Sequence, residues 1–341
     1  MIIALAYPNA ARYYRQNKYY QMIRDKLNSP EKNRQTLPVK YGFKMDEVLL
    51  KILLENHDME LPLHLIVPDG SYRIRSKDVV CTVRPTVIPD ESFVEYYRGK
   101  IPVTKEVLNI SIASPELCYL QAGSQLSQFE LIRFGYELCA DFYYDDNERY
   151  GLAYHSPASN RSKLEVFLNR SNGMTGKRKA QQVLPYIHDH ARSPMEILQS
   201  MIVNLPISYG GFAMKGFELN GNADLSAEGK QILGFDTCRC DIVWKKQKVV
   251  LEYDSDQVHL DSIQHAKDKN RATALSVSGY KVFTMTTSDL HKIEKIEAVM
   301  FALRNALGMK KEAKQFQKFR KKRVELLDWV RGQMQSPDEK C

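Results

Sequence analysis

The 341-residue chain lacks features that define several common protein classes. Its six cysteines have no Cys-x-x-Cys spacing and mostly lie in apolar runs, which predicts reduced core residues rather than a disulfide framework. Cys238 and Cys240 have no second pair, which argues against a zinc site. No apolar stretch approaches the length of a transmembrane helix, and the start has neither the basic region nor the apolar core of a signal peptide. We therefore expect a cytoplasmic protein without a membrane partner.

The charge is basic and unevenly distributed. The formal net charge is +8, and the segment 310–323 alone holds eight Lys or Arg and one Glu. A basic balance favours nucleic acid or another acidic partner, although it does not specify a fold. The length allows two or three domains, and the apolar fraction of 43% is ordinary for a globular protein.

The strongest functional signal lies in two β-rich runs, 238–244 and 249–254, which flank the polar and basic residues 245–248. Apolar, β-branched runs around a short polar break predict an antiparallel hairpin. If the four-residue break is the whole loop, Trp244 faces Val249 across the hairpin. This register decides which side chains meet further along the two strands.

Three carboxylates converge in that register. Continuing the pairing places Asp241 opposite Glu252, with Cβ atoms roughly 5 Å apart. Asp254 shares the face of Glu252 because side chains alternate along a strand. Like charges this close repel one another, so the arrangement favours a bound cation, and oxygen ligands favour magnesium, manganese or calcium. The alternative is an acidic, solvent-facing hairpin, which a register shift of one residue would produce.

Further elements surround the hairpin in a recognisable order. Ser193 and Pro194 begin a helix that is expected to reach Leu205. A second helix is expected from about 262 to 278, where Gly279 follows as a terminating residue. The run 280–285 predicts a final strand. The expected order is therefore helix, hairpin, helix and strand.

This order and its polar residues resemble the PD-(D/E)XK nuclease superfamily, within the branch related to very-short-patch-repair endonucleases. The resemblance implies a restriction-endonuclease-like α/β domain (αβββαβ) and metal-dependent endonuclease activity with Mg²⁺ or Mn²⁺. It also implies a nucleic-acid substrate, with DNA favoured and RNA left open. The chain departs from the family at one place, because Asp254 replaces the lysine of the family name. The matching residues are Glu196, Asp241, Glu252, Asp254, His259, Asp268, Arg271 and the strand start at 279–282.

The resemblance gives each hairpin carboxylate a role. Asp241 and Glu252 are the predicted direct ligands of the divalent ion. Asp254 is a candidate for a second metal position or for orienting the attacking water, and the alternative is a cap of the strand end. Lys267 and Lys269 are candidates to replace the missing lysine.

The remaining site residues have structural alternatives of comparable weight. Glu196 is a candidate for a water-mediated role near the metal, or for a capping box that reaches back to the Ser193 N–H. His259 is a candidate general base or phosphate ligand, or else a loop histidine without such a role. Arg271 is a candidate nucleic-acid contact, although its spacing from Asp268 also favours a surface ion pair.

The chain divides into an N-terminal α+β region (1–190), the nuclease-like domain (191–308) and a basic C-terminal helix with its tail (309–341). The helix is expected over 310–331, with an apolar stripe on one face and lysines on the other. That basic face either grips phosphates or is simply solvated. Its apolar members are Phe316, Phe319, Leu326, Leu327 and Val330, and its candidate nucleic-acid contacts are Lys314, Lys318, Lys321 and Lys322.

The N-terminal region supplies the alternative function. Residues 110–117 are similar to a strand-to-helix segment of AbiEi-like antitoxins, a family of winged-helix transcriptional regulators. This similarity implies a DNA-binding regulator whose nuclease fold is inactive. A third interpretation is an interaction protein that binds an acidic partner through the basic helix. Tyrosines between 13 and 20 interleave with basic residues, and packing is the favoured interpretation over nucleic-acid contact. Strands are expected at 63–67, 79–84 and 101–112, and helices at 44–55, 115–126, 127–139, 162–170, 177–188 and 288–307.

Overall fold

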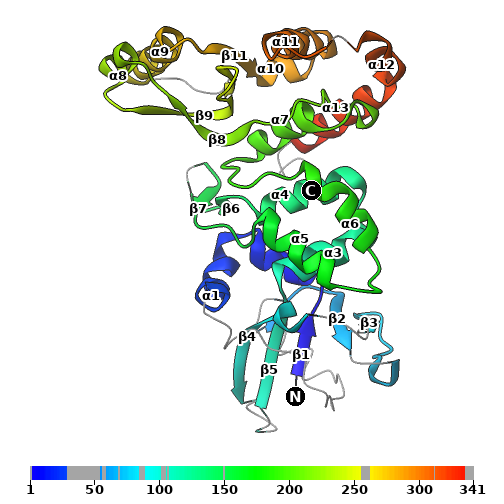
Figure 1. Ribbon diagram of the computed structural model, residues 1–341. Helices are drawn as coiled ribbons and strands as arrows, with labels where there is room; N and C mark the ends of the chain where they lie inside the picture. The colour runs from blue at the N-terminus through cyan, green and yellow to red at the C-terminus, as the bar shows by residue number, and fades with distance from the viewer. Residues whose placement is uncertain are drawn as a thin grey trace. The chain divides into compact units, whose positions relative to one another are not determined.

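The chain forms a mixed α/β protein of two compact units, which are drawn in Figure 1. The structure is a computed structural model that describes residues 2–28, 54–55, 59–67, 70–83, 89–100, 105, 107–148, 150–254, 262–310 and 312–334, with the backbone alone for residues 2, 90 and 262–268. Unit 1 comprises Met1–Asp189 and unit 2 comprises His190–Cys341. The division lies one residue before the boundary expected from the sequence.

Unit 1 contains a five-stranded sheet in the order β3-β2-β1-β5-β4. The expected strands at 63–67 and 79–84 are confirmed as β2 and β3, whereas β1 and β4 had not been expected. β4 carries a bulge between Glu95 and Tyr97, which interrupts the alternation by which a strand is recognised. The strand expected at 101–112 begins at 107 within the described residues. The strands are β1 (Ile2–Leu5), β2 (Leu63–Val67), β3 (Val79–Val83), β4 (Phe93–Lys100) and β5 (Val107–Ala113).

Helices and a small hairpin accompany this sheet. The expected start of α3 is confirmed, because Ser114 Oγ accepts the Leu117 N–H at 3.2 Å. The tyrosines between 13 and 20 are buried, which confirms packing as their role. The expected helix at 44–55 lies almost wholly outside the described residues. The elements are η1 (Asn9–Tyr14), α1 (Asn17–Asn28), η2 (Gly70–Tyr72), η3 (Asp90–Ser92), α3 (Pro115–Gln125), α4 (Gln128–Leu138), β6 (Phe142–Tyr144), β7 (Leu152–Tyr154), α5 (Arg161–Arg170), α6 (Lys177–Val183) and η4 (Leu184–Tyr186).

Unit 2 contains a four-stranded sheet in the order β11-β10-β9-β8. β8, β9 and β10 are antiparallel neighbours, and β11 runs parallel to β10 after a crossover through α9. The expected helix, hairpin, helix and strand are all present, and β8 is an additional strand. The elements are α7 (Pro194–Asn204), η5 (Ile207–Tyr209), β8 (Glu218–Asp224), α8 (Ala227–Leu233), β9 (Thr237–Trp244), β10 (Val249–Asp254), α9 (Ser262–Val277) and β11 (Lys281–Thr286).

The helices after β11 are more interrupted than the sequence suggests. The expected helix at 288–307 is divided into α10 (Thr287–Leu290) and α11 (Ile293–Ala306). The expected basic helix is likewise divided at Phe319 into α12 (Ala313–Lys318) and α13 (Arg320–Met334). These helices pack into unit 2 rather than standing apart, and Phe316, Leu326, Leu327 and Val330 of the expected apolar stripe are buried.

The core of unit 2 positions the hairpin. Ala274 and Leu275 of α9 pack with Cys238, Cys240 and other buried residues of the sheet. Cys118 and Cys139 of unit 1 are also buried, and none of these four thiols forms a disulfide, as the sequence predicts. None of the helices in the described ranges is both long enough and apolar enough to cross a membrane.

Candidate active site

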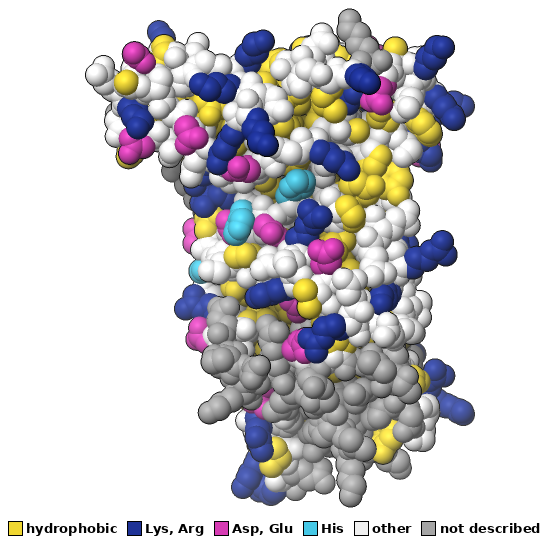
Figure 2. Space-filling view, viewed as in Figure 1, with side chains coloured by type: hydrophobic (Ala, Val, Ile, Leu, Met, Phe, Trp, Pro, Cys, Tyr) yellow, Lys and Arg dark blue, Asp and Glu magenta, His cyan; other side chains and the backbone are white. Residues whose placement is uncertain are grey.

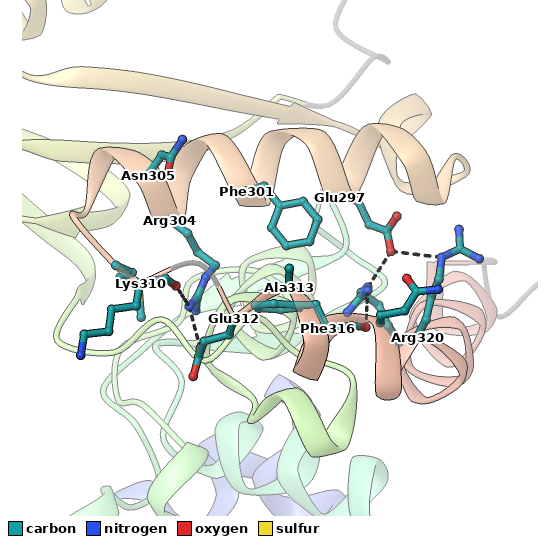
Figure 3. A pocket seen from close by; sticks show the side chains of 12 residues that line it. Glu297, Phe301, Arg304, Asn305, Lys310, Glu312, Ala313, Phe316 and Arg320 are labelled. Carbon is teal, nitrogen blue, oxygen red and sulfur yellow. Dashed lines mark hydrogen bonds and ion pairs between the residues drawn. The ribbon is translucent and has the colours of Figure 1, made fainter.

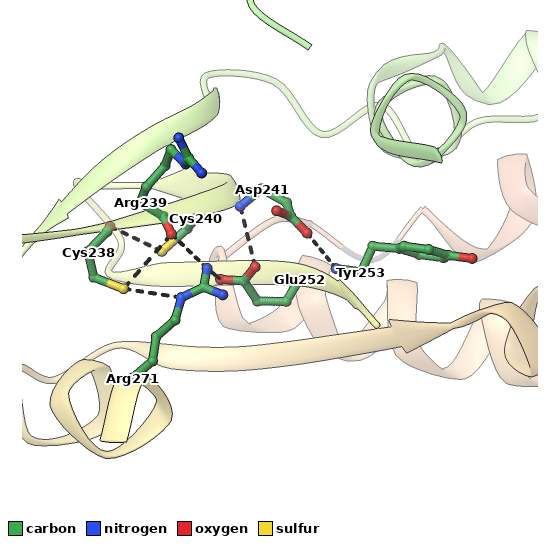
Figure 4. Close-up of polar contacts among 7 residues, drawn as sticks. All are labelled: Cys238, Arg239, Cys240, Asp241, Glu252, Tyr253 and Arg271. Atoms are coloured by element: carbon green, nitrogen blue, oxygen red, sulfur yellow. Dashed lines mark hydrogen bonds and ion pairs between the residues drawn. The ribbon is translucent and has the colours of Figure 1, made fainter. Parts of the chain in front are cut away.

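The β9–β10 hairpin has the register that the sequence predicts. Trp244 pairs with Val249, and the ladder continues to the pair Ile242–Leu251. The next pair in this register is Asp241 and Glu252. The predicted juxtaposition of these two acidic residues is therefore present, and Figure 4 shows their side chains between the two strands.

Two reciprocal contacts join Asp241 and the β10 strand beyond the last ladder pair. The Tyr253 N–H donates to Asp241 Oδ2 at 2.8 Å, and the Asp241 N–H points to Glu252 Oε2 at 3.4 Å (Figure 4). Each carboxylate thus accepts a backbone N–H of the neighbouring strand. These contacts fix the orientation of both carboxylates, while further lone pairs remain on each oxygen.

Arg271 on α9 supplies a cation to this pair. Its Nη2 lies 2.7 Å from Glu252 Oε1, and the same nitrogen donates to the Arg239 carbonyl at 2.6 Å. Its Nε donates to Cys238 Sγ at 3.3 Å. The Glu252 side chain is only 15% exposed, so this ion pair is stronger than a surface pair. Arg271 reaches Glu252 because α9 packs its later turns against the sheet, whereas the side chain of Asp268, the partner suggested by the sequence, is not described.

The pair remains electrostatically strained despite Arg271. Burial, followed by the charge of Asp241, raises the pKa of Glu252 above its ordinary value, and Arg271 only partly opposes this. Burial also raises the pKa of Asp241, against the opposing hydrogen bond from the Tyr253 N–H and the charge of Arg271. A second positive charge would relieve the remaining repulsion.

Glu196 on α7 is a third carboxylate near this pair, and its side chain is buried. Burial and the nearby charge of Asp241 raise the pKa of Glu196 to about 7. The Glu196 N–H donates to Ser193 Oγ at 3.2 Å, so half of the expected capping box is present. The other half of the box was expected to use the Ser193 N–H, but the N–H that Glu196 Oε2 accepts, at 2.8 Å, is that of Arg192. Capping and proximity to Asp241 therefore coexist.

Asn220 is a site residue that the sequence analysis missed. Its side chain donates to Glu196 Oε2 and, at 2.9 Å, to the His190 carbonyl. Asn220 has a left-handed φ of 50°, and it is not among the residues that pair between β8 and β9. Such an irregularity in a strand redirects a side chain. The dipeptide Asn220-Gly221 was the available signal, since these residue types favour positive φ.

The other predicted site residues are less well defined. Asp254 ends β10 and is exposed. His259 lies outside the described residues, and the side chains of Asp268 and Lys267 are not described. Lys269 is exposed. Their predicted roles therefore stay predictions.

The predicted basic face lies on α12 and α13. Its members Lys314, Lys318, Lys321 and Lys322 are exposed, and Lys322 pairs with Glu325 at 2.7 Å. On the face of the molecule in Figure 2, Lys and Arg side chains are scattered among other types rather than gathered in one field. A distributed positive surface of this kind attracts the phosphates of a nucleic acid without distinguishing its sequence.

Asp241 and Glu252 are half-buried, mutually repelling carboxylates, and carboxylate oxygens are the ligands that divalent cations such as Mg²⁺ prefer. Within the described ranges, however, no three His, Cys, Asp or Glu residues are grouped so that they could hold a metal ion. Comparison of the chain with protein-family models, with curated proteins and with solved structures finds no match. Functional conclusions therefore depend on the geometry of the site.

Proposed function

We propose that unit 2 is a metal-dependent endonuclease that cleaves phosphodiester bonds, with DNA as the favoured substrate. The observation that carries this proposal is the half-buried Asp241–Glu252 pair, which retains repulsion although Arg271 contacts it. Repelling carboxylates on adjacent strands are suited to binding a divalent cation. The order α7, β8, β9, β10, α9 and β11, with the short helix α8 inserted between β8 and β9, supports the proposal, since the resemblance to PD-(D/E)XK nucleases implies a series of this kind.

Each residue of the candidate site has its own role in the proposed cleavage. Asp241 and Glu252 would hold Mg²⁺ or Mn²⁺, which when bound polarises a phosphoryl oxygen and lowers the pKa of a water molecule. Glu196, whose pKa is about 7, can accept or release a proton near neutral pH. Arg271 has several N–H groups on one planar guanidinium, so it can contact a phosphate while it remains beside Glu252.

A DNA-binding regulator with an inactive nuclease fold is the second candidate. The observation that favours it is the ion pair between Arg271 and Glu252, because a fixed arginine already neutralises part of the site. Asp254 in place of the family lysine points in the same direction. Under this alternative the protein binds DNA through basic surfaces and does not cleave it.

A cleavage assay distinguishes the two candidates. The full chain is incubated with supercoiled plasmid, linear duplex, single-stranded DNA and RNA, each with Mg²⁺ and with Mn²⁺. The endonuclease produces nicks or fragments only when the metal is present. If the protein binds DNA but cleaves no substrate with either metal, the regulator is correct.

The Asp241→Asn variant assigns the activity to the site. It preserves side-chain size but removes a charge, and we expect cleavage to fall by about 10³-fold, as when a preorganised charge-stabilising group is removed. DNA binding without metal should persist or tighten, because repulsion from phosphate falls. The matched control is Asp236→Asn, since Asp236 is 84% exposed and pairs with Lys230 outside the site. Cleavage that survives in Asp241→Asn would place the activity elsewhere.

A further inference from the structure

A second site in unit 2 is a cavity of about 470 Å³ lined by α11, by Met309, Lys310 and Glu312, by α12 and by the start of α13 (Figure 3). This volume is in the range of pockets that bind small organic ligands. None of its lining residues belongs to the candidate active site. The lining combines aromatic and cationic side chains, among them Phe301, Phe316, Arg304, Arg320, Arg323 and Lys310.

Arg323 is the most informative of these residues. Its side chain is only 2% exposed, its Nε donates to Glu297 Oε1 at 2.8 Å, and its Nη2 donates to the Phe316 carbonyl at 3.1 Å. Its Nη1 is buried and has no hydrogen-bond partner within the described part of the chain. The guanidinium lies over the rings of Phe212 and Phe316, which attract its charge but supply no strong acceptor. A buried donor without an acceptor is rare in native proteins, and the charge of the Arg323 guanidinium beside the cavity favours an anionic ligand there.

The charge of the lining also favours an anion. Arg304 and Glu312 form one ion pair at 2.8 Å. Glu297 is shared between Arg323 and Arg320, the latter at 3.5 Å. Glu297 and Glu312 are thus already paired, and the cationic side chains that line the cavity outnumber them. A phosphate group would balance the excess positive charge.

An aromatic surface accompanies the cations. Phe301 on α11 is 39% exposed and meets Phe316 on α12 edge to face, with ring centroids 5.1 Å apart. Figure 3 shows the Phe301 ring projecting from α11 toward α12. An exposed ring in a cavity offers a stacking surface for a planar ligand. Asn305 and Gln317 lie on the same lining and offer amide groups to the polar edge of such a ligand.

We infer that this cavity binds a nucleoside monophosphate, either free or as the phosphorylated end of a strand. The phosphate lies toward Arg304 and Lys310, which are neighbours at one end of the cavity, and the base stacks on Phe301 (Figure 3). The site goes beyond the proposed cleavage and does not depend on it, because no residue of the Asp241–Glu252 pair takes part.

Calorimetric titration of the full chain, without metal, tests this inference. The probes are the four nucleoside 5′-monophosphates, the corresponding nucleosides, inorganic phosphate, and a 5′-phosphorylated trinucleotide with its unphosphorylated counterpart. We expect at least one mononucleotide or the phosphorylated trinucleotide to bind measurably at about 1 mM. It should bind more tightly than the nucleoside and than inorganic phosphate, because both halves of the ligand contribute. The two phosphorylated probes separate a free nucleotide from a strand end.

Two variants locate the binding without disturbing the buried Arg323. Phe301→Leu keeps an apolar side chain but removes the stacking surface, and should weaken binding about tenfold. Lys310→Gln removes one exposed cation and should weaken it several-fold. The matched controls are Phe235→Leu, at a 70% exposed ring outside the cavity, and Lys292→Gln, at an exposed lysine outside both the cavity and the basic face.

The results support or overturn the inference directly. Weakening in both cavity variants, with wild-type binding in both controls, supports it, whether or not the protein cleaves DNA. Absence of binding to every phosphorylated probe overturns it. So does binding that both cavity variants leave unchanged, or inorganic phosphate that binds as tightly as the best nucleotide.

Discussion

Glu137 in unit 1 and Glu252 in unit 2 are both shielded from solvent and paired with arginine, but their surroundings differ. The Glu137 side chain is 3% exposed and contacts Arg15 Nε at 2.8 Å and Arg133 Nε at 3.0 Å. Tyr144 Oη also donates to Glu137, at 3.3 Å. Two cations and a hydroxyl therefore surround one carboxylate.

Glu252 has the opposite balance. Glu252 forms an ion pair with one arginine, Arg271, and the like-charged Asp241 lies beside it. An acid that arginines fully compensate holds elements of a fold together, whereas an acidic pair with one arginine retains an attraction for a further cation. The comparison distinguishes a structural acid from a functional one, and each prediction below tests one side of it.

The largest expected effect is on the structural side. Glu137→Gln leaves Arg15 and Arg133 without their common counter-charge, and removal of one partner of a buried ion pair costs about 3–5 kcal/mol. Urea unfolding measures the loss. Glu252→Gln serves as the counterpart and should cost clearly less, because it also removes the repulsion from Asp241. Equal losses in the two variants would contradict the comparison.

The second effect is a pH dependence at Glu196. Its folded-state pKa of about 7 lies above the ordinary value of 4.5, so its contribution to stability is complete below pH 4.5 and is lost as the pH rises through 7. We expect Glu196 to lower the free energy of unfolding of the wild type by up to about 3 kcal/mol across this window, in addition to the fall from Glu252, whose pKa is also raised. Glu196→Gln should make the curve less steep, whereas Asp236→Asn should leave it unchanged. A curve of unchanged slope in Glu196→Gln would disprove the raised pKa.

The smallest expected effect is on DNA binding by lysine side chains. Unit 2 contains both a buried, ion-paired cation and exposed cations, so the two kinds can be compared. Arg323 is buried and ion-paired, whereas the four lysines of the basic face are exposed. Replacing Lys314, Lys318, Lys321 and Lys322 with Gln should weaken DNA binding equally across sequences. The slope of log affinity against log salt should fall by up to about 3.6, if each lysine contacts a phosphate. A control with Gln at Lys163, Lys230, Lys281 and Lys292 has the same net charge, and an equal change there would show only a net-charge effect.

Local patterns were sufficient to predict the hairpin. A four-residue polar break between two apolar runs gave the correct pairing of Trp244 with Val249, and alternation then brought Asp241 and Glu252 together. Because register follows from short-range counting, the sequence alone contains this information. The helix expected from residue 115 begins there, because a serine followed by a proline is a local signal for a helix start.

Contacts between distant segments were not predictable in this way. The spacing of Arg271 suggested a helical neighbour as its ion-pair partner, and did not reveal its contact with Glu252, which is 19 residues away. Arg323 was counted within a basic run, although it is buried against Phe212 and Glu297. Such contacts depend on how helices pack, which one sequence does not specify.

Calorimetric titration of the full chain with Mg²⁺ and with Mn²⁺ tests the central claim most directly. At about pH 8, where a carboxyl with a pKa near 7 is mostly ionised, the wild type should bind a divalent ion. Asp241→Asn should lose that binding, and Asp236→Asn should retain it. Failure of the wild type to bind either ion, or unchanged binding in Asp241→Asn, would contradict the claim that this pair is a metal-dependent active site.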